Sequence, residues 1–411
     1  MFQVFLAAAA IGGTLATGIT TATAATVAFT SESAVERALR HNPDLLAARL
    51  AIAEAEGRLL HAGRLANPEV EAAVMPNMEG REFSAGLGVV QKVPLARRLR
   101  LEKAVSPADL EVVKLEVGAA EREVAFKVRL LVVRLLDGQA RREFQRRRVV
   151  HGQEMLAVAA RAAAAGEGSA LAAAELELEA GQLEAGRLQI EAQETAWLGE
   201  LRPLLGLSPA VPLSVTGSLP EPALPGVSDE PDVDQLSRYR VARARTEAAR
   251  RNLSLQQASR WEDVSVGLGY EREHGEDAGY GLRRENIIGL KLSVPLPLGK
   301  NNLSHVREAE ALARRREAEA DAVAAGMRAE AAAARAEMAA AVRVHEQASG
   351  ALLGKARQLE ERYWAAYRAG QASLTDVIRS REKRLALEAS ALEARRDYHL
   401  ARVRFEAATG R

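Results

Sequence analysis

The chain has 411 residues and a net charge of +1, with 27% charged and only 4% aromatic residues. Balanced charge gives no electrostatic argument for nucleic-acid binding, and the few large apolar side chains argue against several thick globular cores. The sequence contains no cysteine, which excludes a disulfide framework, a thiolate metal site and an acylated amino-terminal cysteine.

The first 30 residues carry no Lys, Arg, Asp or Glu. An apolar start followed by small residues, with Ala22-Thr23-Ala24 as a cleavage site, predicts an export signal over residues 1–24. The alternative is an amino-terminal tail or a misplaced start codon. After residue 30 no stretch approaches the ~18–20 uncharged apolar residues of a transmembrane helix. Two possibilities remain open, a soluble periplasmic protein and a protein that spans a membrane with alternating strands.

The second half of the chain repeats the pattern of the first half. Ala165-Gly166 recurs as Ala369-Gly370, and Ser169 as Ser373. Upstream, Val93-Pro94-Leu95 recurs as Val294-Pro295-Leu296 at nearly the same shift. Two copies of one supersecondary unit bury their apolar faces by packing against each other.

The first copy spans residues 25–206. Helical spacing of apolar residues predicts a helix over about 33–65, and period-two alternation predicts a β-hairpin over about 68–94. A long helix follows over 97–164, and we expect Pro107 to kink or break it. A glycine- and serine-containing turn leads into a last helix over 170–205.

A proline-rich linker over residues 207–231 precedes the second copy, which spans 232–411. This copy repeats the order: a helix over about 233–260, a hairpin over about 262–296 with a charged loop at 271–284, a long helix over 301–367 and a helix over 373–409. In both copies the two shorter helices together match the long one in length. They are therefore expected to stack end to end beside it.

Each strand of the second hairpin has one apolar face. We expect these residues to face lipid: Val264, Val266, Leu268, Leu290 and Leu292. The residues between them are expected to face a water-filled lumen: Ser265, Lys291 and Ser293. Four strands cannot close a barrel alone, and lipid does not tolerate an open sheet edge, so several chains must share one barrel. The alternative is a soluble helical protein with two surface hairpins.

In this order and spacing the residues resemble the TolC-type outer membrane efflux proteins. The resemblance rests on Asn42-Pro43-Asp44-Leu45, on the strand ends Gln91 to Leu95 and Ser293 to Gly299, and on the stretch from Tyr367 to Val377. It implies a mainly α protein with a small β part, in which long antiparallel helices form an α-barrel tunnel. The two hairpins, four strands per chain, would contribute to a shared trimeric transmembrane β-barrel in the outer membrane of a Gram-negative bacterium.

The resemblance also implies partners. A homotrimer embedded in outer-membrane lipid would dock onto a periplasmic adaptor and an inner-membrane pump of the RND type, without cofactors or nucleic acid. The adaptor would contact the tip turns at Gly166, Ser169, Gly370 and Ser373. Pro295-Leu296-Pro297-Leu298 and the missing cysteine are most similar to the heavy-metal (cobalt–zinc–cadmium) branch, with drugs or small molecules as the other substrate class. A soluble periplasmic adaptor is the alternative function.

Asp376 and Arg379 lie just past the second tip turn, where members of this family often place aspartates that narrow the entrance. The pair is our sequence-based hypothesis for a periplasmic gate, and an exposed surface pair is the alternative. No nucleophile–base set, phosphate loop or metal-ligand cluster is recognisable, so we expect no enzyme, no catalytic residue and no metal site. His274 among four loop carboxylates is typical of a solvated loop.

Overall fold

A computed structural model describes residues 26–76, 83–94, 97–165, 170–223, 232–259, 262–277, 281–296 and 302–410. The predicted export signal at 1–24 and the turn residues Gly166 and Ser169 lie outside these residues, as do residues 224–231 of the predicted linker.

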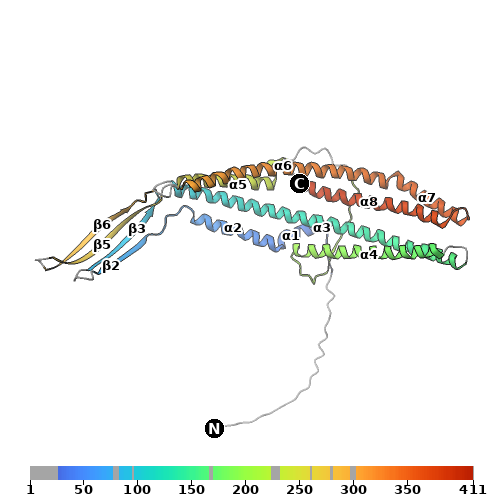
Figure 1. The fold of residues 1–411 in the computed structure, drawn as a ribbon, viewed down its shortest axis with the longest axis horizontal. Helices are drawn as coiled ribbons and strands as arrows, with labels where there is room; N and C mark the ends of the chain where they lie inside the picture. The colour runs from blue at the N-terminus through green and yellow to red at the C-terminus, as the bar shows by residue number, and fades with distance from the viewer. Residues whose placement is uncertain are drawn as a thin grey trace, which may run out of the picture.

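The first copy begins with β1 (Val27–Phe29) and continues in the order helix, hairpin, helix, helix (Figure 1). Its elements are α1 (Ser31–His41), α2 (Pro43–His61), β2 (Glu69–Pro76), β3 (Phe83–Val93), α3 (Arg98–Ala164) and α4 (Ala170–Leu204). After β4 (Leu213–Val215) the second copy repeats the order. Its elements are η1 (Val233–Gln235), α5 (Ser237–Ala258), β5 (Val264–Asp277), β6 (Gly281–Ser293), α6 (Leu303–Ser349), α7 (Ala351–Arg368) and α8 (Leu374–Thr409).

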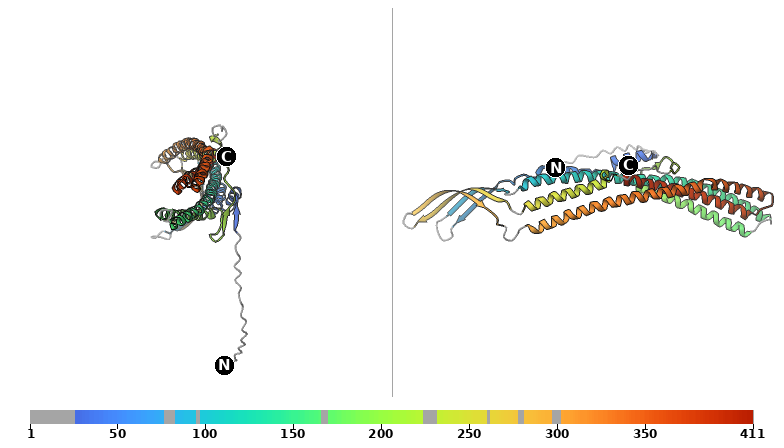
Figure 2. Two further views of the ribbon diagram at one scale, coloured as in Figure 1. Left: turned by 90° about the vertical axis from the view of Figure 1, so that its right-hand side faces the viewer. Right: turned by 90° about the horizontal axis from the view of Figure 1, so that it is seen from above.

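The helices form one elongated layer with the strands at one end and the helix-reversing turns at the other (Figure 1). α3 packs against α1, α2 and α4, while α6 packs against α5 and α8. α4 continues the line of α1 and α2, and α8 continues the line of α5. The end-to-end stacking expected from the helix lengths is therefore present in both copies. Viewed along its length, the layer is curved, and β1 and β4 lie on its convex side (Figure 2).

Three helix boundaries differ from the sequence-based prediction. The first helix is divided at Asn42, whose side chain caps α2 by accepting from the Leu45 N–H and donates to the carbonyl of Leu204 at the end of α4. Gly350, with ψ of −134°, separates α6 from α7. Pro107 does not break α3, which runs on through it. Packing against α2 and α5 holds α3 together there, at a site where proline alone would disfavour a helix.

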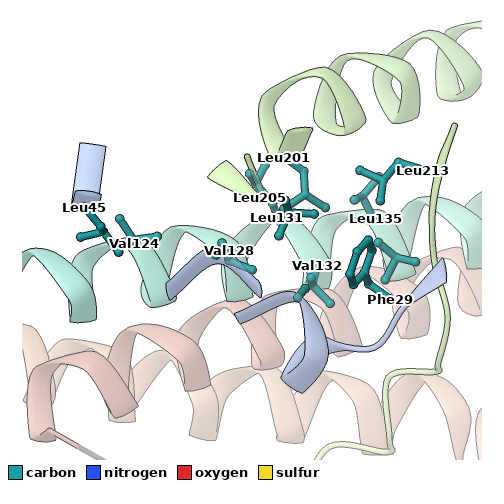
Figure 3. Packing of buried hydrophobic residues seen from close by; sticks show 13 residues of the cluster. Phe29, Leu45, Val124, Val128, Leu131, Val132, Leu135, Leu201, Leu205 and Leu213 are labelled. Atoms are coloured by element: carbon teal, nitrogen blue, oxygen red, sulfur yellow. The ribbon is translucent and has the colours of Figure 1, made fainter. Parts of the chain in front are cut away.

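The predicted linker also contains structure. β1 and β4 pair in parallel, with Val27 opposite Leu213 and Phe29 opposite Val215. Their side chains join the largest buried apolar cluster among the described residues, in which residues of β1, β4, α1, α2 and α4 pack around α3 (Figure 3). The alternation in these three-residue strands is too short to be recognised in a sequence, and their pairing depends on segments far apart in the chain.

Two histidines fasten the segment after β4 to the second copy. Nε2 of buried His399 in α8 lies 2.9 Å from the carbonyl oxygen of Pro220. His345 in α6 places Nε2 2.5 Å from Oε2 of Glu221 and Nδ1 3.1 Å from the carbonyl oxygen of Ala391. The segment thus ties the two copies together on α6 and α8.

Burial lowers the pKa of His399, and the positive charges of Arg402 and Arg395 act in the same direction. Its pKa in the folded chain is therefore below that in the unfolded chain, where it is close to the ordinary value. As the pH falls through the unfolded value, the unfolded state binds the proton first and the folded state loses stability.

We expect the stability advantage of the wild type over His399→Gln to shrink between pH 7.5 and pH 5.5, because the glutamine amide can donate to Pro220 but does not titrate. Thermal unfolding at both pH values measures this difference. His305→Gln, at an exposed histidine of α6, is the control and should show no such change. A pH-independent gap between wild type and His399→Gln would show that His399 does not control the acid sensitivity.

Candidate functional site

The four long strands form one antiparallel sheet in the order β2-β3-β5-β6. The hairpins of the two copies meet along β3 and β5, where Val89 lies opposite Leu268 and Gly88 opposite Gly269. The segment expected to be a charged loop at 271–284 is largely strand, because β5 continues to Asp277 and β6 starts at Gly281. Among the described residues, β2 and β6 each have one edge without a partner strand.

The two faces of this sheet differ in chemistry, as the alternation predicted. Ser265, Lys291 and Ser293 share one face with most of the strand glycines. Nζ of Lys291 on β6 lies 2.9 Å from Oε2 of Glu71 on β2, although β3 and β5 lie between them. Side chains can reach so far only if the sheet curls toward them. We call this polar side the concave face and the other side the convex face.

Glycines make the floor of the concave face. A Cβ atom on Gly267 would lie 2.9 Å from Cγ2 of Val90, one of the few apolar residues of this face. Above the glycines is a hollow of about 250 Å³. Lys92 pairs with Glu69 at 2.6 Å on the same face, so both lysines of the sheet are neutralised by β2. The concave face is thus a wettable surface with little side-chain bulk.

The convex face is apolar and open to its surroundings. Leu290 is 77% exposed, and Leu268 and Leu292 also lie largely exposed. Val266 is exposed to a smaller extent. Val264 shares this face but is only 6% exposed, since it lies at the start of β5 beside the helices. The expectation that Val264 faces lipid is therefore wrong for this chain, and Val264 serves in packing.

The apolar run on the convex face is displaced between the two hairpins. On β5 it ends at Tyr270, whereas on β3 it continues to Phe83, which lies opposite His274, four positions further along β5. At about 3.4 Å per residue this offset is ~14 Å along the strands. It occurs in one step, at the seam where β3 and β5 pair directly.

The tip turn of the second copy is built by its own backbone. Gly370 has a φ of +74°, which favours glycine, and its N–H donates to the carbonyl of Tyr367 at 3.0 Å. Ser373 then caps α8 together with Asp376. The Ser373 hydroxyl donates to Oδ2 of Asp376 at 2.7 Å, and the Asp376 N–H donates to the Ser373 hydroxyl. This is a reciprocal capping box.

Capping explains Asp376 better than a gate does. The hydrogen bond from the Ser373 side chain is the main cause that lowers the pKa of Asp376, and the charge of Arg379 contributes least. No ion pair joins these two described residues, and Arg379 is exposed. Asp376 and Arg379 therefore do not neutralise each other within α8, and a gate role for this pair stays a prediction.

A buried group of charges lies farther along the same helix pair. Arg384 of α8 contacts Glu360 of α7, and its Nη1 lies 2.8 Å from Oε1 of Glu388. Nε of Arg381 lies 3.8 Å from Oε1 of Glu360. The side chains of these four residues are only 10% to 14% exposed. We call Glu360, Arg381, Arg384 and Glu388 the buried charge cluster.

This cluster lies where the helix pair α7–α8 of the second copy meets the helix pair α3–α4 of the first. Burial lowers the pKa of Arg381, while the negative charges of Glu360, of Glu154 in α3 and of Glu179 in α4 oppose that effect. Nearer the tip, Met155 and Leu176 of the first copy pack with Trp364 of the second. For Arg384, burial opposes the charge, but its bonds to Glu360 and Glu388 outweigh burial and raise the pKa. Sequence reasoning missed the cluster, since its members are separated along the chain and resemble ordinary surface charges.

The described residues include no group of three or more His, Cys, Asp or Glu side chains placed to hold a metal ion. His274 lies within β5, with its ring 6.0 Å from that of Phe83. No helix in the described parts of the chain is both long and apolar enough to cross a membrane.

No protein-family model matches the chain, and no curated protein matches it. Solved structures do match, over 92% of this chain in each case. CusC has a TM-score of 0.74 at 17% identity over 91% of its chain, and its structures concern transmembrane channel formation. The outer-membrane channel OprN has 0.75 at 17% over 89%, and the outer membrane protein VceC from Vibrio cholerae has 0.74 at 19% over 96%. The fold expected from the resemblance is thus confirmed: this chain has the fold of the TolC-type outer membrane channels.

Proposed function

We propose that the chain is one subunit of a trimeric outer membrane channel, the passive exit duct of a tripartite efflux system. The observation that carries this proposal is the sheet. It has an apolar convex face, a polar concave face with a glycine floor, and two edges without partners. In lipid such edges must be paired, and pairing β6 of one copy with β2 of the next would do so.

Physical size favours three copies over two. Two copies would give eight strands, and the interior of a barrel of about eight strands is filled by its own side chains. Three copies would give twelve strands and leave room for water. The glycines of the concave face suit a passage, because they add no bulk to the lumen.

The fold similarity supports the remaining parts of the proposal. An export signal over 1–24 would bring the chain to the periplasm of a Gram-negative bacterium, where the helices would form a tunnel. The tip turns near Gly166, Ser169, Gly370 and Ser373 would contact a periplasmic adaptor, which links the duct to an inner-membrane pump, in our proposal of the RND type. The adaptor alternative is disfavoured, because the four strands join two helical hairpins in one sheet, whereas an adaptor would carry one hairpin beside a lipoyl-like domain.

Two substrate classes remain in the proposal, heavy-metal cations and small organic molecules. The motif around Pro295 favours the metal branch. Similarity of fold to outer membrane channels does not separate the two classes. Export assays in a strain that carries the cognate pump would decide between them.

The sheet faces provide a direct test. Leu292→Arg places a charge on the convex face and should cost about 2–4 kcal/mol in lipid near the bilayer midplane. We expect it to lower the yield of detergent-stable trimers extracted from outer membranes. Ser293→Arg, at the next residue and also exposed, points into the concave face and should assemble as the wild type does. A wild-type protein recovered as a soluble periplasmic monomer would refute the channel itself. Equal assembly of both variants would refute the assigned faces.

We propose further that the buried charge cluster, rather than Asp376 and Arg379, holds the periplasmic end closed. Opening a tunnel at its tip requires one helical hairpin to move against the other, and the cluster lies where they meet. Separation would expose Arg381 to water and weaken its attraction to Glu154 and Glu179. The packing of Met155 against Trp364 would be lost in the same movement.

Glu360→Gln removes the carboxylate that Arg381 and Arg384 share in the buried charge cluster. Breaking a buried ion pair in this way lowers the free energy of unfolding by about 3 kcal/mol. We expect a lower unfolding temperature and a higher single-channel conductance in planar bilayers. Glu361→Gln, at the exposed neighbouring residue, is the control and should change neither. Asp376→Asn should weaken only the helix cap. If Asp376→Asn raised the conductance and Glu360→Gln left it unchanged, the buried charge cluster would not be the gate, and the pair Asp376 and Arg379 would be the better candidate.

A further inference from the structure

Positive charges follow directly after the apolar run on the convex face, at the end of the sheet far from the helices. The last apolar row holds Tyr270 and Ile288, and the next pairs Arg272 with Asn286. One row further, His274 lies opposite Arg284. Because side chains alternate along a strand, Arg272 and Arg284 share the face of Leu268 and Leu290.

These two arginines are exposed and form no ion pair with any carboxylate that the structure describes. The neighbouring Arg283 points to the concave face and pairs with Glu285 at 2.7 Å. Glu271 and Glu273, which flank Arg272 in sequence, also belong to the concave face. At this end of the sheet the described glutamates therefore lie on the concave face, which is acidic, whereas Arg272 and Arg284 lie on the convex face. On the convex face the one carboxylate placed by register is Glu276, whose side chain lies outside the description.

Aromatic side chains mark the same level as the edge of an apolar layer. Tyr270 is 45% exposed and its hydroxyl donates to Oδ1 of Asn286 at 2.8 Å. Phe83 is 41% exposed beside His274, whose Nδ1 is buried without a described hydrogen-bond partner. Tyrosines with an apolar ring and a bonded hydroxyl are typical of the interface between a membrane and water.

We propose that Arg272 and Arg284 bind the phosphate groups of a phosphorylated glycolipid in the outer leaflet around the channel, with His274 beside them. This proposal rests on the proposed function, which places this end of the sheet at the cell exterior. Arg272 and Arg284 are diagonal neighbours on adjacent strands, a spacing of about 7–8 Å. Two guanidinium groups at that spacing can approach one phosphate from both sides, each with two parallel N–H donors.

The apolar rows identify a lipid as the occupant. A phosphate held between the two arginines would be attached to acyl chains lying along Ile288, Leu290 and Leu87, all largely exposed. A soluble phosphate would gain nothing from these residues. On the concave face the same end of the sheet carries carboxylates and repels anions, so the site faces outward only.

The test uses the purified trimer in detergent and native mass spectrometry with three probes: a bisphosphorylated lipid A, the same lipid without phosphates, and inorganic phosphate. The double variant Arg272→Gln/Arg284→Gln should bind the bisphosphorylated lipid at least about tenfold more weakly than the wild type, since each charged contact is worth roughly that factor. Arg283→Gln, one residue from Arg284 but on the concave face, should bind as the wild type does.

Equal loss in Arg283→Gln and in the double variant would overturn the site, as would equal binding of the lipid without phosphates. Displacement of the lipid by millimolar inorganic phosphate would show a site for soluble anions and overturn the lipid assignment. The same spectra report the trimer, and bilayer conductance reports the channel. If both persist in the double variant while lipid binding is lost, both proposals stand. If the wild type forms neither a trimer nor a channel, the proposed function fails first.

Discussion

The backbone pairing of β3 with β5 is the interaction on which the rest of the structure depends. It joins the hairpins of two separate copies into one sheet, with Val89 opposite Leu268 and Gly88 opposite Gly269. A slip of one residue along this seam would turn every side chain of one hairpin to the other face. The apolar convex face, the glycine floor and the contact between Lys291 and Glu71 all require this one register. The helices inherit their order from it, because α3 leaves β3 and α5 enters β5 side by side.

Helix length is the second constraint. In the first copy α3 runs from the sheet to the tip, and in the second α6 and α7 together do so, so the shorter helices beside them must meet end to end in the middle. That joint leaves helix ends with unpaired backbone groups, which need partners. Asn42 provides one by capping α2 while donating to the carbonyl of Leu204. His399 acts on the segment after β4 instead, through its contact with the carbonyl of Pro220. The paired strands β1 and β4 lie at the same level. Near the middle of the helical layer, polar side chains thus serve to hold segments of the chain together.

The sequence predicted those elements in which apolar residues recur with a helical or a strand period. Alternation identified the strands and their faces, and helical spacing with glycine and serine located Gly370 and Ser373 at a turn. The break at Gly350 was missed because glycine in an alanine-rich helix carries no other signal, and Pro107 was overrated because tertiary packing holds α3. At the candidate site the same limit applies. Asp376 was recognised by position but acts as a cap, while the buried charge cluster depends on contacts between α7 and α8 that no spacing in the sequence reveals.

The placement of charge bears on what the duct can select. Near the helices, each lysine of the concave face is neutralised by a glutamate of β2, and the residues between them are largely glycine. Because these lysines are already paired, the concave face near the helices offers a passing molecule no free cationic group. Specific recognition needs a few polar groups that converge in an enclosed site. In the described strands such convergence is missing on the concave face, whereas Arg272 and Arg284, which form no ion pair with a described carboxylate, lie on the convex face. In the proposed duct, the choice of substrate would therefore rest with the protein that loads it.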